Sequence, residues 1–162
     1  MPRRRHILSC LLPLALAAGG VLAVTAPASA VGCQGSVCDG ASPVTMGCDA
    51  DARLLDEVDT TGLSVRFYHS PTCDASWAYV TATPDVEQNP PAADIYYLPQ
   101  LGGSEAYFTA GYVNSTDVAK ATPMVGGNAQ AKGCAEDDGP GADPAPEVWQ
   151  QKGDHGLCTA WH

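Results

Sequence analysis

Six cysteines downstream of an N-terminal export signal constrain the fold of this chain more than any other feature. They are Cys33, Cys38, Cys48, Cys73, Cys134 and Cys158, and the seventh cysteine, Cys10, lies inside the signal. An even number of cysteines in a small exported chain is the usual sign of a disulfide framework. Six cysteines allow 15 pairings, and their spacing does not choose among them. We therefore predict three disulfides with their connectivity left open.

The first 30 residues have the three parts of a cleavable signal peptide. These parts are a basic start at 3–5, an apolar run at 7–24 and a small-residue cleavage site at 28–30. We predict cleavage between Ala30 and Val31. No second apolar stretch of about 20 residues follows, so we expect no membrane span after cleavage. The predicted localisation is secreted and extracellular.

A metal site is the competing interpretation of the cysteines, because thiolates at Cys33, Cys38 and Cys48 could gather around zinc. The spacing provides no C-x-x-C pair and no nearby H-x-x-x-H pattern. Acidic residues also cluster nearby, at Asp49, Asp51, Asp56 and Asp59. A calcium-binding EF-hand loop starting at Asp49 would need a glycine and a glutamate where this chain has Leu54 and Thr60. We therefore read the acidic residues as a solvated face and predict no metal and no cofactor.

The stretch around which the rest of the chain is organised contains two apolar runs separated by a proline. Apolar and polar residues alternate over 63–68, which is the period-two pattern of a strand. Pro71 interrupts the pattern because it lacks a backbone N–H. A second alternating run follows over 75–80. We predict a pair of strands joined by a tight corner, with Phe67, Pro71 and Trp77 in the structural core.

Shorter strands are predicted further along, at 94–98, 105–110 and 122–125. One short helix is predicted at 49–58, where apolar residues recur every three positions and Gly62 lies past the end. Short strands separated by Gly and Pro are typical of small antiparallel folds. The predicted fold is mainly β: a small disulfide-stabilised antiparallel barrel or sandwich with at most one short helix.

The predicted domain organisation has four segments. They are a signal peptide at 1–30, a disulfide-stabilised β domain at 31–134, an acidic Pro- and Gly-rich linker at 135–146 and a C-terminal tail at 147–162. The linker is almost devoid of apolar residues. The tail carries Trp149, Leu157 and Trp161, which are unfavourable to leave exposed. We therefore expect Cys158 to tie the tail to the body, with Cys134 as a candidate partner.

Charge narrows the range of partners. Removal of the signal leaves five of the eight basic residues against 18 acidic ones, so the formal charge moves from −10 to −13. Phosphate backbones and anionic lipid surfaces both bind through several Lys or Arg contacts. We therefore predict no nucleic-acid partner and a monomer. The acidity is interpreted as a source of solubility, with attraction to a cationic partner or to metal ions as the alternative.

Three stretches, at 33–40, 46–52 and 68–78, carry a resemblance to a known family. Their ordered cysteines and the Tyr-x-Ser-Pro-x-Cys-x-x-x-Trp-Ala core resemble the family named domain of unknown function 2690. Its members are typically exported or membrane-tethered proteins of actinobacteria. The resemblance implies no activity, cofactor or catalytic residue. This chain departs from the pattern at Tyr79, where Arg commonly follows Trp-Ala, and at 41–43, where Lys-Asp-Pro is common.

Two classes of function fit the sequence. The first is a non-enzymatic binding or interaction domain acting on an extracellular protein or a cell-envelope component. The second is a small secreted hydrolase that uses a carboxylate with His69, His155 or His162. No G-x-S-x-G is present, and the cysteines are expected to be oxidised, which leaves no evident nucleophile. We favour the binding domain, read the histidines as exposed loop residues and assign no catalytic residue.

Overall fold

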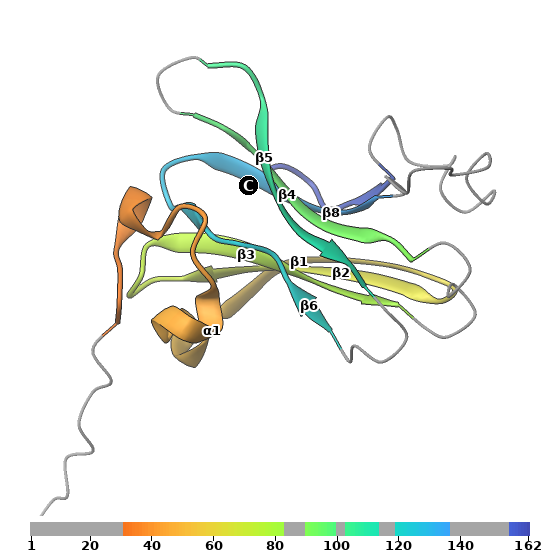
Figure 1. The fold of residues 1–162 in the computed structure, drawn as a ribbon, viewed down its shortest axis with the longest axis horizontal. Helices are drawn as coiled ribbons and strands as arrows, with labels where there is room; N and C mark the ends of the chain where they lie inside the picture. The colour runs from red at the N-terminus through yellow and green to blue at the C-terminus, as the bar shows by residue number, and fades with distance from the viewer. Residues whose placement is uncertain (1–30, 83–89, 100–102, 114–118, 137–155) are drawn as a thin grey trace, which may run out of the picture.

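Two antiparallel sheets face each other in the computed structural model of this protein, which describes residues 31–82, 90–99, 103–113, 119–136 and 156–162 (Figure 1). The first sheet contains β1 (Arg53–Thr60), β2 (Leu63–Ser70) and β3 (Ala75–Ala82), with β6 (Lys120–Ala121) and β7 (Val125–Gly126) both paired with β3. The second sheet has the order β5 (Ala106–Tyr112), β4 (Ala92–Leu98), β8 (Gln130–Glu136) and β9 (Leu157–Cys158). The mainly β prediction is confirmed, and the sheets form a sandwich rather than a closed barrel.

The predicted strand pair is present as β2 and β3, which pair antiparallel with Phe67 opposite Ala78. Phe67 and Trp77 are buried, as expected of core residues. Pro71 is not: it is exposed in the turn between the two strands, so its placement in the core was wrong. Its fixed φ and missing N–H suit a turn position, where its ring contributes to the shape of the corner and not to the packing.

The helix predicted at 49–58 is also wrong. Only a 3₁₀ turn, η2 (Cys48–Asp51), is helical there, and the remainder belongs to strand β1. A bulge between Leu54 and Asp56 shifts the register against β2 and leaves Leu54 and Leu55 both exposed, which produced the misleading three-residue spacing. Gly62, with φ of 92°, forms the β1–β2 turn instead of ending a helix.

The later strands match the prediction at their centres and differ at their ends. β4 begins two residues earlier than expected, and β5 continues through Gly111, whose φ of 78° few other residues adopt. The strand predicted at 122–125 is an exception and was largely wrong, because only Val125 is a strand residue and 122–124 lie between β6 and β7. Between them, Thr122 continues the contact with β3, because its N–H donates to the Ala78 carbonyl at 2.8 Å and its hydroxyl accepts from the Ala78 N–H at 2.9 Å.

The interior of the sandwich is a hydrophobic cluster contributed by both sheets. Its fully buried members include Val65, Phe67 and Val80 from the first sheet and Ile95 from the second. The sheets approach closely at Gly133 on β8, where an added Cβ would lie 2.3 Å from the Cβ of Ala78. This position therefore requires a glycine.

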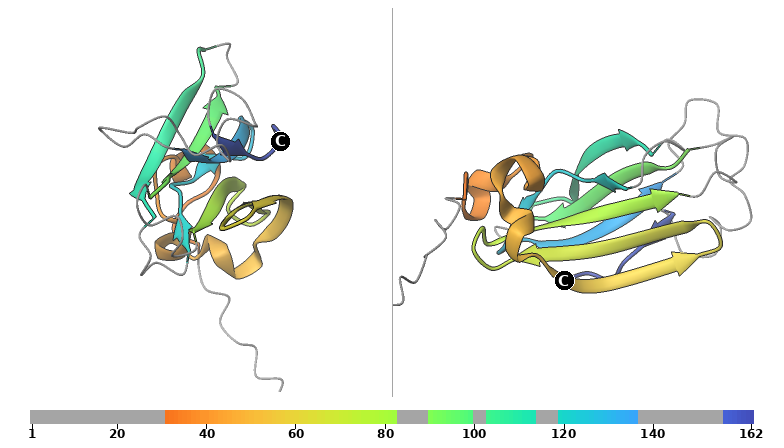
Figure 2. Two further views of the ribbon diagram at one scale, coloured as in Figure 1. Left: turned by 90° about the vertical axis from the view of Figure 1, so that its right-hand side faces the viewer. Right: turned by 90° about the horizontal axis from the view of Figure 1, so that it is seen from below.

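A second hydrophobic cluster covers the opposite face of the first sheet. The N-terminal segment supplies its outer layer, through η1 (Gly35–Cys38), α1 (Pro43–Met46) and η2. Four cysteines from this segment and from the β2–β3 turn pack there with Trp77 and Met124, both 0% exposed. The segment lies at one end of the first sheet (Figure 2). At that end, β3 is covered on both faces, which is why Trp77 is buried although it points away from the sandwich interior.

The six cysteines form three disulfides: Cys33–Cys38, Cys48–Cys73 and Cys134–Cys158. The third joins β8 to β9, as expected for the tail. β8 continues through Ala135 and Glu136, so the first two residues of the predicted linker are buried strand residues. The predicted signal peptide and the rest of the predicted linker lie outside the described residues. Within the described part of the chain, no helix is long and apolar enough to cross a membrane.

The C-terminal segment 156–162 lies along β8 beyond the two residues of β9. The N–H of Thr159 donates to the Gly133 carbonyl at 3.0 Å, and Ala131 and His162 exchange two backbone hydrogen bonds of 3.0 and 2.9 Å. The ring of His162 stacks on Phe67 at a centroid distance of 5.4 Å. The segment therefore connects the edge of the second sheet with the first sheet.

Candidate functional site

A pocket of about 320 Å³ lies where the N-terminal segment meets the turn before β8 and the end of β4. Its lining includes the polar side chains of Ser36, Asp39, Tyr97 and Asn128 together with the apolar Pro99 and Val125. These residues come from parts of the chain that are far apart in sequence. The volume is at the lower end of the range of about 300–1,000 Å³ that is usual for small-molecule sites.

Hydrogen bonds fix the pocket wall that carries Asp39. One carboxylate oxygen of Asp39 accepts from the N–H of Gly126 on β7 at 2.6 Å. Two backbone bonds continue the contact, from Gly40 to Met124 at 2.9 Å and from Met124 to Ala41 at 2.8 Å. A Cβ added to Gly126 would lie 2.7 Å from the backbone N of Ser36, so the glycine permits this close approach.

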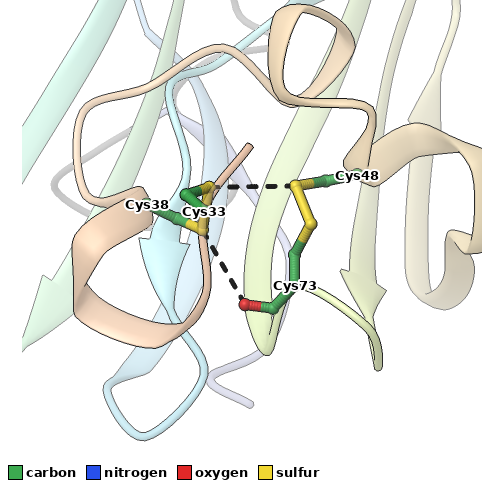
Figure 3. A group of neighbouring side chains, drawn as sticks. All are labelled: Cys33, Cys38, Cys48 and Cys73. Carbon is green, nitrogen blue, oxygen red and sulfur yellow. Dashed lines mark hydrogen bonds between the residues drawn. A yellow bond between two sulfur atoms is a disulfide. The ribbon is translucent and has the colours of Figure 1, made fainter. Parts of the chain in front are cut away.

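Disulfides hold the same wall from the other side. The Cys33–Cys38 bond closes a short loop around η1, from which Ser36 projects, and Asp39 follows directly. This disulfide lies against the Cys48–Cys73 bond, with the Sγ atoms of Cys33 and Cys48 4.0 Å apart (Figure 3). The wall is thus set by covalent bonds as well as by hydrogen bonds, which favours a preformed pocket.

The opposite wall comes from the second sheet. Tyr97, on β4, stacks on Phe108 of β5 at a centroid distance of 5.3 Å and an interplanar angle of 19°. Its ring is therefore held in place by a neighbour. Among the described lining residues, Asp39 is the one that carries a formal charge at neutral pH. The pocket therefore suits a small ligand that is neutral or positively charged and offers groups for hydrogen bonding.

Two members of the acidic cluster are structural instead of solvated. The carboxylate of Asp51 accepts hydrogen bonds from the hydroxyl of Ser70 at 2.5 Å and from the hydroxyl and N–H of Thr72 at 2.6 and 3.0 Å. These bonds, with the Ser70 hydroxyl first and the Thr72 hydroxyl next, lower the pKa of Asp51 from 3.8. Asp51 thus holds the β2–β3 turn, and the solvated-face interpretation was wrong for this residue.

Asp56 has a similar role at the C-terminal segment. Its carboxylate accepts from the backbone N–H of Ala160 at 2.9 Å and lies 3.3 Å from Nε2 of His162. The Ala160 hydrogen bond is the largest influence that lowers the pKa of Asp56 from 3.8. This carboxylate joins β1 to the segment that lies along β8.

The candidate catalytic histidines that the structure describes, His69 and His162, do not lie together in one site. Nδ1 of His69 lies 3.1 Å from the hydroxyl of Ser76, on the neighbouring strand. Among the described residues, no carboxylate contacts the other ring nitrogen of His69, so an orienting group for a Ser–His pair is missing there. His162 is engaged with Asp56 and Phe67 instead. His155 lies outside the described residues.

Residues 36–135 match the sequence model of the family described as "Protein of unknown function (DUF2690)". The chain belongs to this family. All the pocket-lining residues named above lie inside the matched stretch of this DUF2690 protein, as do four of the six cysteines, while Cys33 and Cys158 lie outside it. No curated protein and no solved structure matches the chain.

Sequence reasoning did not identify the pocket residues of this DUF2690 protein. Ser36, Asp39, Tyr97 and Asn128 have no shared spacing, and each is of a type common in loops or strands. The usable signal was the position of Asp39 and Gly40 directly after a cysteine, inside one of the stretches that carried the family resemblance. That signal could indicate a constrained turn, but it could not indicate which distant residues the turn faces.

Proposed function

We propose that this protein is a secreted, non-enzymatic binding domain that holds a small saccharide unit of the cell envelope in the pocket between the N-terminal segment and β4. The observation that carries the proposal is the convergence of a hydroxyl, a carboxylate and an amide, from Ser36, Asp39 and Asn128, in one concave site next to Tyr97. Hydroxyl-rich ligands need several such partners placed on a rigid frame.

Supporting observations concern compartment and charge. Three disulfides are typical of proteins in oxidising, extracellular compartments. The acidic chain and the single carboxylate in the pocket disfavour anionic ligands. A neutral or amino-substituted sugar therefore fits better than a phosphorylated or uronic one.

The test is a titration of the purified protein with neutral, amino and acidic mono- and disaccharides, followed by protein-observed NMR. We expect shifts of the Ser36, Asp39 and Asn128 amides with neutral or amino sugars. Ser36→Trp places a large side chain at the exposed mouth of the pocket and should abolish the shifts. Thr61→Trp, in the exposed β1–β2 turn, is the matched control and should leave them unchanged.

Two results would contradict the proposal. One is the absence of binding across the whole panel, and the other is binding that Ser36→Trp does not weaken. A preference for acidic sugars would contradict the assigned ligand charge while leaving the pocket as the site.

A small secreted hydrolase is the second candidate, and one contact favours it, the 3.1 Å approach of His69 to Ser76. A histidine next to a serine hydroxyl is the arrangement that activates a nucleophile. Esterase activity towards a nitrophenyl ester that is lost in both Ser76→Ala and His69→Ala would support it. Activity that persists in both variants, or is absent from the unmodified protein, would exclude this pair as the catalytic site.

A further inference from the structure

Two disulfides of the N-terminal segment lie against each other and bring four sulfur atoms into one buried cluster. The Sγ atoms of Cys33, Cys38, Cys48 and Cys73 all lie within 4.8 Å of one another, and those of Cys33 and Cys48 are 4.0 Å apart (Figure 3). Three of the four residues are fully buried, and Cys33 is 8% exposed. Trp77 and Met124 pack around them. The cluster is thus dry and has a single, slightly accessible side.

This spacing fits a four-thiolate metal centre. Zinc in structural sites is bound tetrahedrally with Zn–S distances of about 2.3 Å, which places the sulfur atoms about 3.8 Å from one another. Sulfur atoms of different disulfides already lie near that separation. Only the two sulfur atoms within each disulfide would have to move apart. A closed site of four cysteines in apolar surroundings is the usual composition of a structural zinc site.

The segments that carry the four cysteines are also positioned without their sulfur bonds. The N–H of Gly35 donates to the carbonyl of Cys73 at 2.8 Å, and the N–H of Gly32 donates to the carbonyl of Met46 at 2.9 Å. The first bond joins the Cys33–Cys38 loop to Cys73, and the second joins the residue before Cys33 to α1, just before Cys48. Neither of these backbone hydrogen bonds involves a sulfur atom.

We propose that this cluster becomes a Cys₄ site for Zn²⁺ when both of its disulfides are reduced. Reduction of each disulfide takes up two electrons from a thiol or phosphine reductant and two protons from the thiol or from water. With a phosphine, each disulfide consumes one phosphine and one water, and yields two thiols and a phosphine oxide. Binding of Zn²⁺ then releases four protons from the four thiols, giving a zinc tetrathiolate with a net charge of −2. The cluster thus has an oxidised form closed by two S–S bonds and a reduced form closed by one metal ion.

The experiment uses the purified protein, reduced anaerobically with a water-soluble phosphine and titrated with Co²⁺ as a spectroscopic substitute for Zn²⁺. We expect one Co²⁺ per chain with the thiolate charge-transfer and tetrahedral ligand-field bands of four-sulfur coordination, and displacement by one equivalent of Zn²⁺. Alkylation of the reduced protein, read by peptide mass mapping, should modify the partly exposed Cys158 with or without zinc, whereas zinc should lower the modification of the four clustered cysteines relative to the metal-free protein.

Two double variants separate this site from the other cysteines. Cys33→Ser/Cys38→Ser retains the Cys48–Cys73 bond, so its folding can be verified in the oxidised state. After reduction, the affinity of this variant for Co²⁺ should fall by more than roughly 100-fold. Removal of a group that only supports a metal ligand costs roughly 10–100-fold, and this variant loses two of the ligands themselves. Cys134→Ser/Cys158→Ser is the matched control and should bind Co²⁺ with the same spectrum and stoichiometry.

Three outcomes would overturn the proposal. They are failure of the reduced protein to bind Co²⁺ or Zn²⁺, coordination by fewer than four thiolates, and undiminished binding by Cys33→Ser/Cys38→Ser. The second cysteine group with a nearby carboxylate, formed by Cys134, Glu136 and Cys158, offers only three ligand atoms. A fourth contradicting outcome is metal bound there, which would appear as zinc-dependent protection of the partly exposed Cys158 from alkylation.

Discussion

The carboxylate of Asp56 on β1 accepts a hydrogen bond of 2.9 Å from the backbone N–H of Ala160, 104 residues later in the chain. The segment that contains Ala160 is hydrogen-bonded on its other side to β8. One side chain of the first sheet is thereby joined to the edge of the second. This contact adds a polar link to the apolar packing that otherwise holds the two sheets together.

Loss of this link should loosen the C-terminal segment. Asp56→Ala leaves the Ala160 N–H without its charged acceptor and should lower the free energy of unfolding by about 1–2 kcal/mol. Hydrogen exchange at the amides of Thr159 and His162 should become faster. Asp59→Ala, an exposed carboxylate on the same strand, is the control. Unchanged exchange in Asp56→Ala would show that the Cys134–Cys158 bond alone holds the segment.

Acidic pH should lower the folding stability of the protein through protonation of Asp51 and Asp56. Both carboxyls have a pKa lowered from 3.8 in the folded state. Their contribution to stability is therefore complete above the unfolded-state pKa and is lost as the pH falls through the lowered values. The urea midpoint should therefore fall progressively as the pH drops below about 4. Asp51→Asn/Asp56→Asn should be less stable at neutral pH and show a flatter profile, and a profile parallel to that of the unmodified protein would contradict this assignment.

The disulfides should differ in how much they stabilise. Cys48–Cys73 and Cys134–Cys158 close loops with sequence separations of 25 and 24, whereas Cys33–Cys38 closes one of 5. Loop-closure entropy assigns about 3.5 kcal/mol to each of the longer loops and about 2 kcal/mol to the short one. Guanidinium unfolding of the three Cys→Ser double variants should reproduce this order. A short-loop variant less stable than the other two would show that contacts around η1 outweigh loop entropy.

Gly133 should tolerate no side chain. A Cβ at this position would lie 2.3 Å from Ala78 on the facing sheet, and both backbones are held by strand pairing. Gly133→Ala should therefore destabilise the protein by about 1–3 kcal/mol, as overpacked cores do. Gly32→Ala is a useful comparison, because the nearest atom, at 2.7 Å, is the sulfur of the flexible Met46 side chain. An equal loss of unfolding free energy in Gly133→Ala and Gly32→Ala would mean that the two sheets can move apart at little cost.

Local alternation was sufficient to predict β2 and β3. In β2 the buried Leu63, Val65 and Phe67 alternate with more exposed residues, so the sequence pattern follows burial, whereas β4 is buried on both faces over Ala92–Tyr96 and shows no such alternation. β1 was missed because its bulge exposes Leu54 and Leu55 together, which breaks the period of two. A bulge depends on how β1 pairs with β2, so the sequence of residues 53–60 alone does not predict it.

The candidate site was less predictable than the fold. The family resemblance did point to the stretch containing Asp39, and the prediction that cysteines form disulfides is confirmed. Asp39 accepts a hydrogen bond from the backbone of Gly126, and Tyr97 lines the same pocket. These contacts depend on how the N-terminal segment docks on the first sheet, which is a tertiary property. Likewise, the role of Asp51 depends on Ser70 and Thr72 in a turn 19–21 residues away.

The docking of the N-terminal segment over Trp77 has an optical consequence. Trp77 is 0% exposed and packs among the disulfides, Trp161 is 37% exposed, and the described part of the sandwich interior contains no tryptophan. The blue-shifted, disulfide-quenched emission expected of Trp77 would therefore report on the interface between the N-terminal segment and the first sheet. Undocking of that segment would brighten and red-shift the signal even while the interior of the sandwich stays intact and spectroscopically silent.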